Sequence, residues 1–123
     1  YLLAFTFLSI NISCNNDDLL DTYNTGNKSE KFFGKWTSVG NRTEEFILEF
    51  NSKEFISYSN SNDNIKTNHV WYNDDVKIHY LRNGKGSKNQ VRKTYYYLLN
   101  TTNDTLKISS GGNLWEIYSK QSN

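Results

Sequence analysis

The feature that most constrains the fold is a series of short segments, from Phe32 onward, in which apolar and polar residues alternate. A period of two places successive side chains on opposite faces of a β-strand. The clearest segment is DVKIHYL (75–81), where Val76, Ile78 and Tyr80 share one face. Clusters of Asn, Asp, Gly and Ser separate the segments, and these residues favour turns. The pattern therefore predicts β-strands joined by short links.

These segments predict about eight strands of roughly seven residues at a spacing of roughly ten. No segment shows the period of about 3.6 residues that is typical of an amphipathic helix. Short links favour antiparallel neighbours in up-and-down order, and closure removes the sheet edges that promote aggregation. We therefore expect an all-β fold, a small antiparallel up-and-down barrel. Its predicted strands cover residues 34–40, 44–50, 53–59, 66–72, 75–81, 91–100, 105–110 and 114–120.

The composition supports one folded domain over residues 32–123. Aromatic residues make up 15% of the chain although hydrophobic residues reach only 36%, and large rings can close a small core. The interior of a barrel of about eight strands is filled by side chains or holds one small ligand. The net charge is +1, which gives no general attraction to nucleic acid, and we expect no nucleic-acid partner.

The chain begins with an uncharged apolar run, YLLAFTFLSI (1–10). A bilayer core about 30 Å thick requires roughly 20 apolar residues, so this run is too short to cross it. Its length is typical of the apolar region of a signal peptide. The sequence contains no Met, and we expect the signal peptide, residues 1–13, to be truncated at its start.

The one cysteine, Cys14, follows directly after Ser13. A single cysteine cannot form a disulfide within the chain, and a catalytic thiol needs a partner His in a folded cleft. The sequence NISC resembles a bacterial lipobox, whose cysteine is acylated, although Asn11 stands where that motif usually has Leu. The resemblance implies a lipid anchor on Cys14. An ordinary secretory signal or a short buried N-terminal strand would also fit these residues.

Residues 14–31 are polar and rich in Asn, Asp and Ser, a composition that favours a flexible tether. The acidic NNDD (15–18) after the cysteine resembles the export signal of Bacteroidetes-type lipoproteins. That resemblance implies an outer-membrane lipoprotein, on the cell surface or on the periplasmic face, whose membrane contact is its lipid. A solvated acidic linker is the alternative for the same residues.

Two motifs resemble the short lipocalin-like domains of Bacteroidetes-type lipoproteins. FFGKWTSV (32–39) opens the first strand with an aromatic residue, Gly and Trp, and YYYLLNTTNDTLKIS (95–109) is similar to the final hairpin of those domains. We find neither the Thr-Asp-Tyr triplet nor the C-terminal helix of true lipocalins. The resemblance implies a site for a small hydrophobic ligand inside the barrel, lined by Trp36, Phe46, Leu48, Tyr80, Tyr97 and Trp115.

The segment RNGKGSKNQVRK (82–93) gathers positive charge around two glycines but lacks the spacing of a P-loop. As an exposed loop it could contact an anionic partner, such as a glycan, a lipid headgroup or a surface protein, whereas a solvated hairpin tip is the alternative. In YYY (95–97), alternation places Tyr96 on the outer face, where it is a candidate for interactions. The cations of the segment are Arg82, Lys85, Lys88, Arg92 and Lys93.

No set of residues predicts an active site or a metal centre. His69 and His79 supply at most half of a tetrahedral zinc site, and we interpret both as surface histidines. Neighbouring residues on a strand point to opposite faces, so Glu44–Glu45 and Asp74–Asp75 are not facing carboxylate pairs. We therefore expect no enzyme activity, no metal and no cofactor. Thr105, in Asp-Thr-Leu, matches an O-glycosylation pattern of Bacteroidetes-type exported proteins, with an ordinary turn as the alternative.

These features predict an exported, lipid-anchored, lipocalin-like barrel that acts as a binding or interaction module. The alternative is a structural or inhibitory surface lipoprotein with a filled core and no ligand, and the third possibility is an enzyme whose acid and base are not paired in sequence. An interior cavity lined by Phe46, Leu48, Tyr80 and Tyr97 would favour binding. A solid core would favour the structural role.

Overall fold

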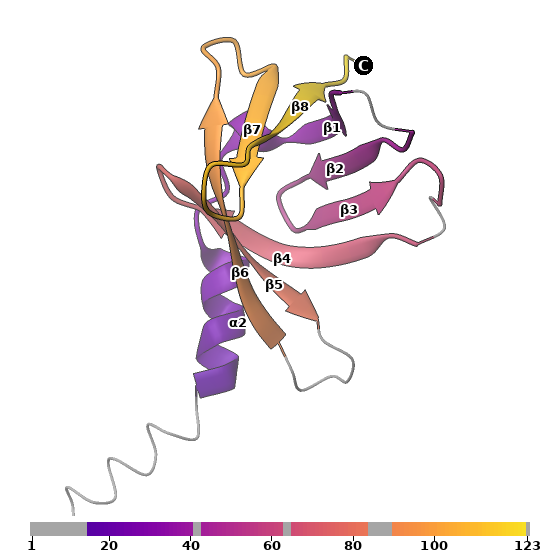
Figure 1. The fold of residues 1–123 in the computed structure, drawn as a ribbon. Coiled ribbons are helices and arrows are strands. Elements are labelled where there is room, and N and C mark those ends of the chain that lie inside the picture. The colour runs from indigo at the N-terminus through magenta and orange to yellow at the C-terminus, as the bar shows by residue number, and fades with distance from the viewer. Residues whose placement is uncertain (1–14, 41–42, 63–64, 84–89, 123) are drawn as a thin grey trace, which may run out of the picture.

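In the computed structural model the chain forms a closed barrel of eight antiparallel strands (Figure 1). The structure describes residues 15–40, 43–62, 65–83 and 90–122. Each strand pairs with its neighbours in the sequence, and β8 closes the barrel against β1, which confirms the predicted up-and-down order. The strands are β1 Gly34–Ser38, β2 Phe46–Phe50, β3 Phe55–Ser59, β4 Thr67–Asn73, β5 Lys77–Asn83, β6 Gln90–Leu99, β7 Thr105–Ser109 and β8 Glu116–Lys120.

Three turns at one end of the barrel share the same hydrogen-bond pattern. Each begins with Asn or Asp, whose side-chain oxygen accepts two backbone N–H groups of the turn, and this chemistry explains why Asn and Asp mark these links. The side chains are Asn51, Asp74 and Asn100, with acceptor distances between 2.6 and 3.0 Å. We call this end, with turns 51–54, 74–76 and 100–104, the closed end.

Aromatic rings fill the half of the barrel next to the closed end. Trp36, Trp71 and Phe32 are fully buried, and the Trp36 indole N–H donates to the Phe32 carbonyl at 2.8 Å. The Phe50 ring packs edge-on against the rings of Phe55 and Trp71 at 4.7 and 4.9 Å. Large rings thus supply the core, as the composition predicts.

A helix, α2 Asn15–Thr25, packs on the outer wall formed by β4 and β5 (Figure 1). This helix differs from the expectation of a flexible tether over residues 14–31, a segment whose sequence shows no helical period. Tyr23 explains the difference, since its buried ring packs edge-on against Tyr72 at 5.0 Å. Tertiary packing therefore decides the conformation. None of the helices in the described ranges is long and apolar enough to cross a membrane.

The segment after α2 covers the closed end. Asn73 fastens it, because the Asn73 backbone N–H donates to the Asn27 carbonyl and the Asn73 side-chain oxygen accepts the Ser29 N–H, both at 2.8 Å. The short 3₁₀ helix η1 Glu30–Phe32 then brings the Phe32 ring against the core. The opposite end of the barrel, where β1, β3, β5 and β7 finish, has no such cover among the described residues, and we call it the open end.

Candidate functional site

Two adjoining hollows lie at the open end. The first has a volume of about 350 Å³, and apolar side chains that include Phe46, Leu48 and Ile65 line it. The second has a volume of about 680 Å³, and its lining includes Tyr80 and three cations, Arg82, Arg92 and Lys93. Tyr95 and Glu116 belong to both linings. The open end therefore offers an apolar surface and a cationic surface side by side.

Stacked aromatic rings form the floor of the hollows. The Tyr80 ring lies between those of Phe55 and Tyr95, with centroid distances of 5.4 and 5.1 Å. Burial raises the pKa of the Tyr80 phenol, and its hydrogen bond with Tyr95 acts in the same direction. The phenol therefore stays protonated and neutral at ordinary pH. The floor combines flat apolar surface with hydroxyl groups that can bond a ligand.

His69 is the buried polar group beneath the apolar hollow, with only 6% of its surface exposed. Burial lowers the pKa of its imidazole, so the ring is neutral near pH 7. Its Nδ1 lies 3.3 Å from the Leu81 carbonyl oxygen and its Nε2 lies 3.3 Å from the Ser57 hydroxyl. Because a carbonyl can only accept, we assign the proton to Nδ1, and the Ser57 hydroxyl then donates to Nε2.

The Ser57 hydroxyl and the His69 imidazole satisfy each other's need for a hydrogen-bond partner inside the barrel. A serine bonded to an imidazole nitrogen is also the pairing from which nucleophilic catalysis begins. Here the Leu81 carbonyl takes the position that a carboxylate occupies in a catalytic triad, and a carbonyl carries no full charge to stabilise an imidazolium. The pair therefore suits a structural or ligand-bonding role better than a catalytic one.

Three of the five cations predicted to bind an anionic partner belong to the described residues. Arg82, Arg92 and Lys93 are exposed and line the second hollow, whereas Lys85 and Lys88 lie outside the described residues. Glu116 is the acid in the same lining, and its carboxylate accepts the Tyr118 hydroxyl at 3.0 Å. The β5 and β6 side of the second hollow therefore has the chemistry to hold an anionic group.

The six residues predicted to line an interior ligand site do not form one cavity. Phe46 and Leu48 line the apolar hollow and Tyr80 the cationic one, whereas Trp36 is fully buried in the filled core. Tyr97 lines a separate pocket at the closed end.

Trp115 corrects the prediction, because it is 40% exposed and lies outside the barrel interior. Strand β8 begins only at Glu116. Its register places Tyr118 opposite the buried Leu106, so Tyr118, not Trp115, points inward. The structure thus brings three of the six predicted residues to the open end, in two hollows.

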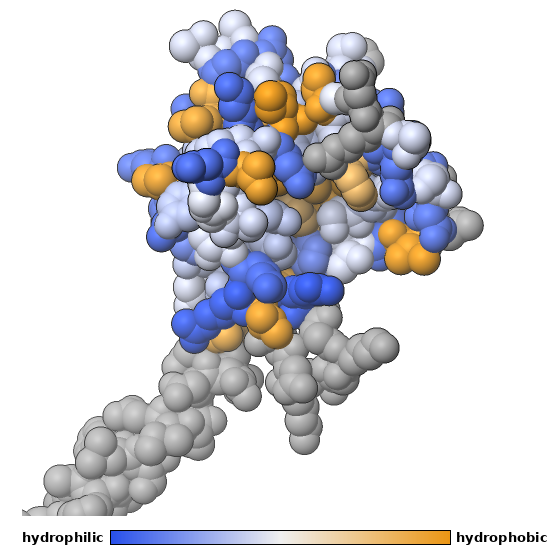
Figure 2. All heavy atoms as spheres, in the orientation of Figure 1, coloured by the Kyte–Doolittle hydropathy of each residue, from blue (hydrophilic) through white to orange (hydrophobic). Residues whose placement is uncertain are grey.

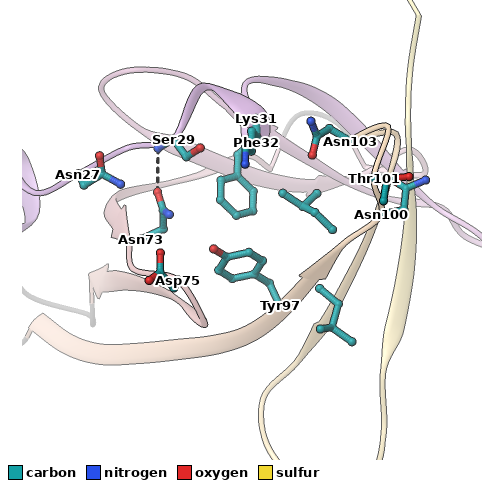
Figure 3. A pocket seen from close by; sticks show the side chains of 12 residues that line it. Asn27, Ser29, Lys31, Phe32, Asn73, Asp75, Tyr97, Asn100, Thr101 and Asn103 are labelled. Atoms are coloured by element: carbon teal, nitrogen blue, oxygen red, sulfur yellow. Dashed lines mark hydrogen bonds between the residues drawn. The ribbon is translucent and has the colours of Figure 1, made fainter.

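The pocket at the closed end has a volume of about 460 Å³ and a mainly polar lining (Figure 3). Figure 3 shows the rings of Phe32 and Tyr97 next to each other, packed edge-on with centroids 4.8 Å apart, and Asn27, Ser29 and Asn73 along one side. The central side chains already hold the fold together, since Asn73 binds Ser29 and Asn100 caps the turn after β6. We therefore interpret this pocket as the junction at which the segment after α2 packs against the barrel.

The remaining titratable groups do not assemble a metal centre. His69 and His79 lie on neighbouring strands but face opposite sides of the wall, and His79 binds Asp74 at 2.8 Å. The interpretation of His69 as a surface residue is wrong, because its ring packs against Tyr80 in the interior. No group of three His, Cys, Asp or Glu side chains in the described ranges could hold a metal ion.

The acidic pairs serve local structure. The Glu44 carboxylate accepts hydrogen bonds from the Ser59 and Ser61 hydroxyls, and these bonds lower its pKa. Asp74 caps the turn between β4 and β5. Asp75 lines the closed-end pocket. Each carboxylate therefore has a different neighbourhood, and the two pairs do not form facing dyads.

Ser57, Ile65, Tyr95 and Glu116 also belong to the open end, and sequence reasoning did not select them for it. A signal existed for Tyr95, because it has the same parity as Tyr97 on a strand predicted to be half buried. No sequence signal selects Glu116, because a carboxylate is rarely found inside a barrel. Its position at the mouth of the barrel is visible only in the structure.

Comparison of the chain with protein-family models, with curated proteins and with solved structures finds no match. The lipocalin-like resemblance stays a prediction from the two motifs at 32–39 and 95–109, with which the barrel topology is consistent. The chemistry of the open end is therefore the basis for inferring a function.

Proposed function

We propose that this protein is a binding module that takes a small amphipathic anion at the open end of its barrel. The observation that carries the proposal is the adjacency of the two hollows, one apolar and one cationic, which share Tyr95 and Glu116. The apolar part of a ligand would lie over Phe46 and Ile65, and its charge would lie near Arg82.

The physical basis is that one hollow would bind the apolar part of the ligand and the other would bind its charged group. Burial of an apolar group contributes about 25 cal/mol per Å² removed from water, and the apolar hollow offers that burial. Arginine forms charge-assisted and bidentate hydrogen bonds with carboxylate or phosphate. Arg82 offers such a group, and Lys93 adds a cation on the same face of the wall. Glu116 between the hollows repels a misplaced anion, so it favours one orientation of the ligand.

The second candidate is a structural or inhibitory protein without a ligand, and the filled closed half favours it. Trp36, Trp71 and Phe55 leave the core of that half solid, so a ligand would reach only the open half. We propose the binding role because the open half presents an aromatic floor and unevenly distributed charge, which a solid structural barrel does not require.

Export and lipid attachment are part of the proposal and rest on the sequence. They are supported by the apolar run at 1–10 and by the Ser13-Cys14 pair, which lie outside the described residues. If Cys14 carries the lipid at an outer membrane, a Cys14→Ala variant leaves the membrane fraction of the expressing cells after a wash at high salt, which weakens contacts between charged groups. Retention of that variant in the membrane after the wash would contradict the anchor.

The binding role is tested with 8-anilinonaphthalene-1-sulfonate, a fluorescent amphipathic anion, and with its uncharged analogue N-phenyl-1-naphthylamine. We expect the double variant Arg82→Gln, Lys93→Gln to weaken binding of the anion about tenfold, a loss of about 1.4 kcal/mol, and to leave the uncharged probe unaffected. Ile65→Ser should weaken both probes, because it removes apolar surface from the first hollow.

Lys107→Gln is the matched control, since Lys107 is exposed on β7 and lines neither hollow at the open end. The proposal fails if the wild-type chain binds neither probe, or if the control variant loses as much affinity for the anion as the double variant does. Failure with both probes would favour the structural role.

A further inference from the structure

Exposed apolar side chains gather at the open end. Among the large apolar residues that are exposed in the described part of the chain, six lie there, on the ends of strands or on the loops next to them: Val39, Phe46, Ile65, Val91, Leu114 and Trp115. By the same criterion the closed end carries two such residues, Val76 in a turn and Leu98 near the end of β6. At the open end Leu114 is 86% exposed and Ile65 is 65% exposed, so both present most of their apolar surface to solvent.

Positive charge accompanies these side chains on one side of the open end. Arg82 and Arg92 on β5 and β6 are exposed, and Lys66 is exposed just before β4. Among the described acids of this end, Glu44 and Glu45 precede β2, where Glu44 is bonded to serine hydroxyls. Glu116 begins β8 and shares the lining of the second hollow with Arg82. The open end therefore has a cationic side that complements an anionic surface.

The arrangement suits a lipid surface better than a protein partner. The apolar side chains come from separate loops around the hollows, and Figure 2 shows apolar groups as separate clusters with hydrophilic groups between them. A stable protein interface has a contiguous apolar core. A membrane interface accepts separate apolar tips, prefers Trp at headgroup level and attracts Lys and Arg when its lipids are anionic.

We propose that the open end docks on the surface of an anionic lipid bilayer. Leu114, Val39 and Ile65 enter the interface, Trp115 lies at the level of the headgroups, and the arginines of β5 and β6 contact lipid phosphates. The hollows then open directly onto the bilayer. This docking goes beyond the proposed ligand site and does not depend on it, because it uses residues such as Val39 and Trp115 that line neither hollow.

Tryptophan fluorescence tests the docking in the full chain. Trp36 and Trp71 are fully buried whereas Trp115 is 40% exposed, so Trp115 is the one of the three whose environment a bilayer would change. We expect vesicles of phosphatidylcholine with phosphatidylglycerol to shift its emission to shorter wavelength and bromine-labelled acyl chains to quench it. Vesicles of phosphatidylcholine alone should act more weakly, and added salt should weaken the effect.

Two matched pairs of variants locate the contact. Leu114→Ser should weaken vesicle binding at least about fivefold, the effect of losing about 1 kcal/mol, whereas Leu98→Ser on the outer wall should have no effect. Val39→Ser at the open end should weaken it, and Val76→Ser at the closed end should not; both valines are 55% exposed.

The docking is wrong if Trp115 emission does not respond to anionic vesicles, even when the chain sediments with them through residues 1–14. It is equally wrong if the two members of either pair lose the same affinity. Because the ligand probes do not report on Val39, loss of vesicle binding in Val39→Ser with normal probe binding separates the membrane contact from the ligand site.

Discussion

The two ends of the barrel are built from the same eight strands but differ in chemistry. At the closed end, aromatic rings fill the interior, three Asn or Asp side chains hold the turns, and Phe32 covers the core. At the open end, the interior also contains polar side chains of His, Tyr, Arg and Ser beside Phe46 and Leu48, and the loops present apolar groups to solvent. From this contrast we expect the closed end to contribute most of the stability of the fold.

The largest expected effect is the loss of a ring from the closed end. Trp36→Ala removes a fully buried indole and its hydrogen bond to the Phe32 carbonyl. We expect the free energy of unfolding to fall by about 3–5 kcal/mol, a large part of the 5–15 kcal/mol that is typical of a whole domain. Urea unfolding followed by circular dichroism measures it.

Phe46→Ala at the open end is the control for this comparison. Phe46 is 37% exposed and lines the apolar hollow, so its loss should cost less than about 1 kcal/mol while it reduces binding of the uncharged probe. Equal destabilisation by the two variants would show that stability is shared evenly between the two ends.

A smaller effect is expected where α2 meets the wall. A Cβ at Gly26 would lie 2.6 Å from the Tyr72 Cβ and 2.8 Å from the Thr22 backbone oxygen, so Gly26→Ala must displace the helix from β4. We expect a loss of about 1–3 kcal/mol and faster proteolysis within 15–25. Asn24→Ala, at an exposed position of the same helix, should change neither. A stable, protected Gly26→Ala variant would show that the helix does not depend on this approach.

The smallest effect concerns the pH dependence of the closed end. The hydrogen bond from His79, with those from the Val76 and Lys77 N–H groups, lowers the pKa of Asp74 from 3.8 to about 2. Because the folded-state pKa lies below the unfolded one, the carboxylate stabilises the fold above about pH 4, and this contribution disappears as the pH falls towards 2. Exposure of the carboxyl keeps it below about 1 kcal/mol.

Asp74→Asn isolates that charge, since an amide oxygen can still accept the two N–H groups of the turn. Its unfolding free energy, measured at a series of pH values, should show a shallower fall between pH 4 and pH 2 than that of the wild type. The same slope in both proteins would show that a group other than Asp74 causes the loss of stability at low pH.

The strands could be predicted because alternation and turn residues agree along most of the chain. The run at 75–81 predicted Val76, Ile78 and Tyr80 on one face. Ile78 and Tyr80 are buried, whereas Val76 lies in the turn before β5 and is exposed. Alternation fails where both parities carry apolar residues. In LWEIYSK, Trp115 and Ile117 compete with Leu114 and Tyr118, and only the pairing of β8 with β7 decides between them.

The helix and the buried histidine could not be predicted for a related reason. Asn, Asp and Thr in α2 have low helix propensity, and the contact of Tyr23 with Tyr72, far along the chain, decides its conformation. His69 shares its parity with Trp71, yet an unpaired imidazole is costly to bury. Its partners, the Ser57 hydroxyl and the Leu81 carbonyl, become visible only when β3, β4 and β5 lie in register.

The pairing of β1 with β8 also bears on how the chain reaches its fold. Seven of the eight strand pairings join neighbours in the sequence, whereas the Gln121 amide reaches Thr37 across 84 residues. Synthesis from the N-terminus delivers β8 last, so the preceding strands form a sheet with two unpaired edges until that strand arrives. The entropic cost of loop closure is therefore concentrated in one late step. That step is the pairing of β8 with β1, which closes the barrel.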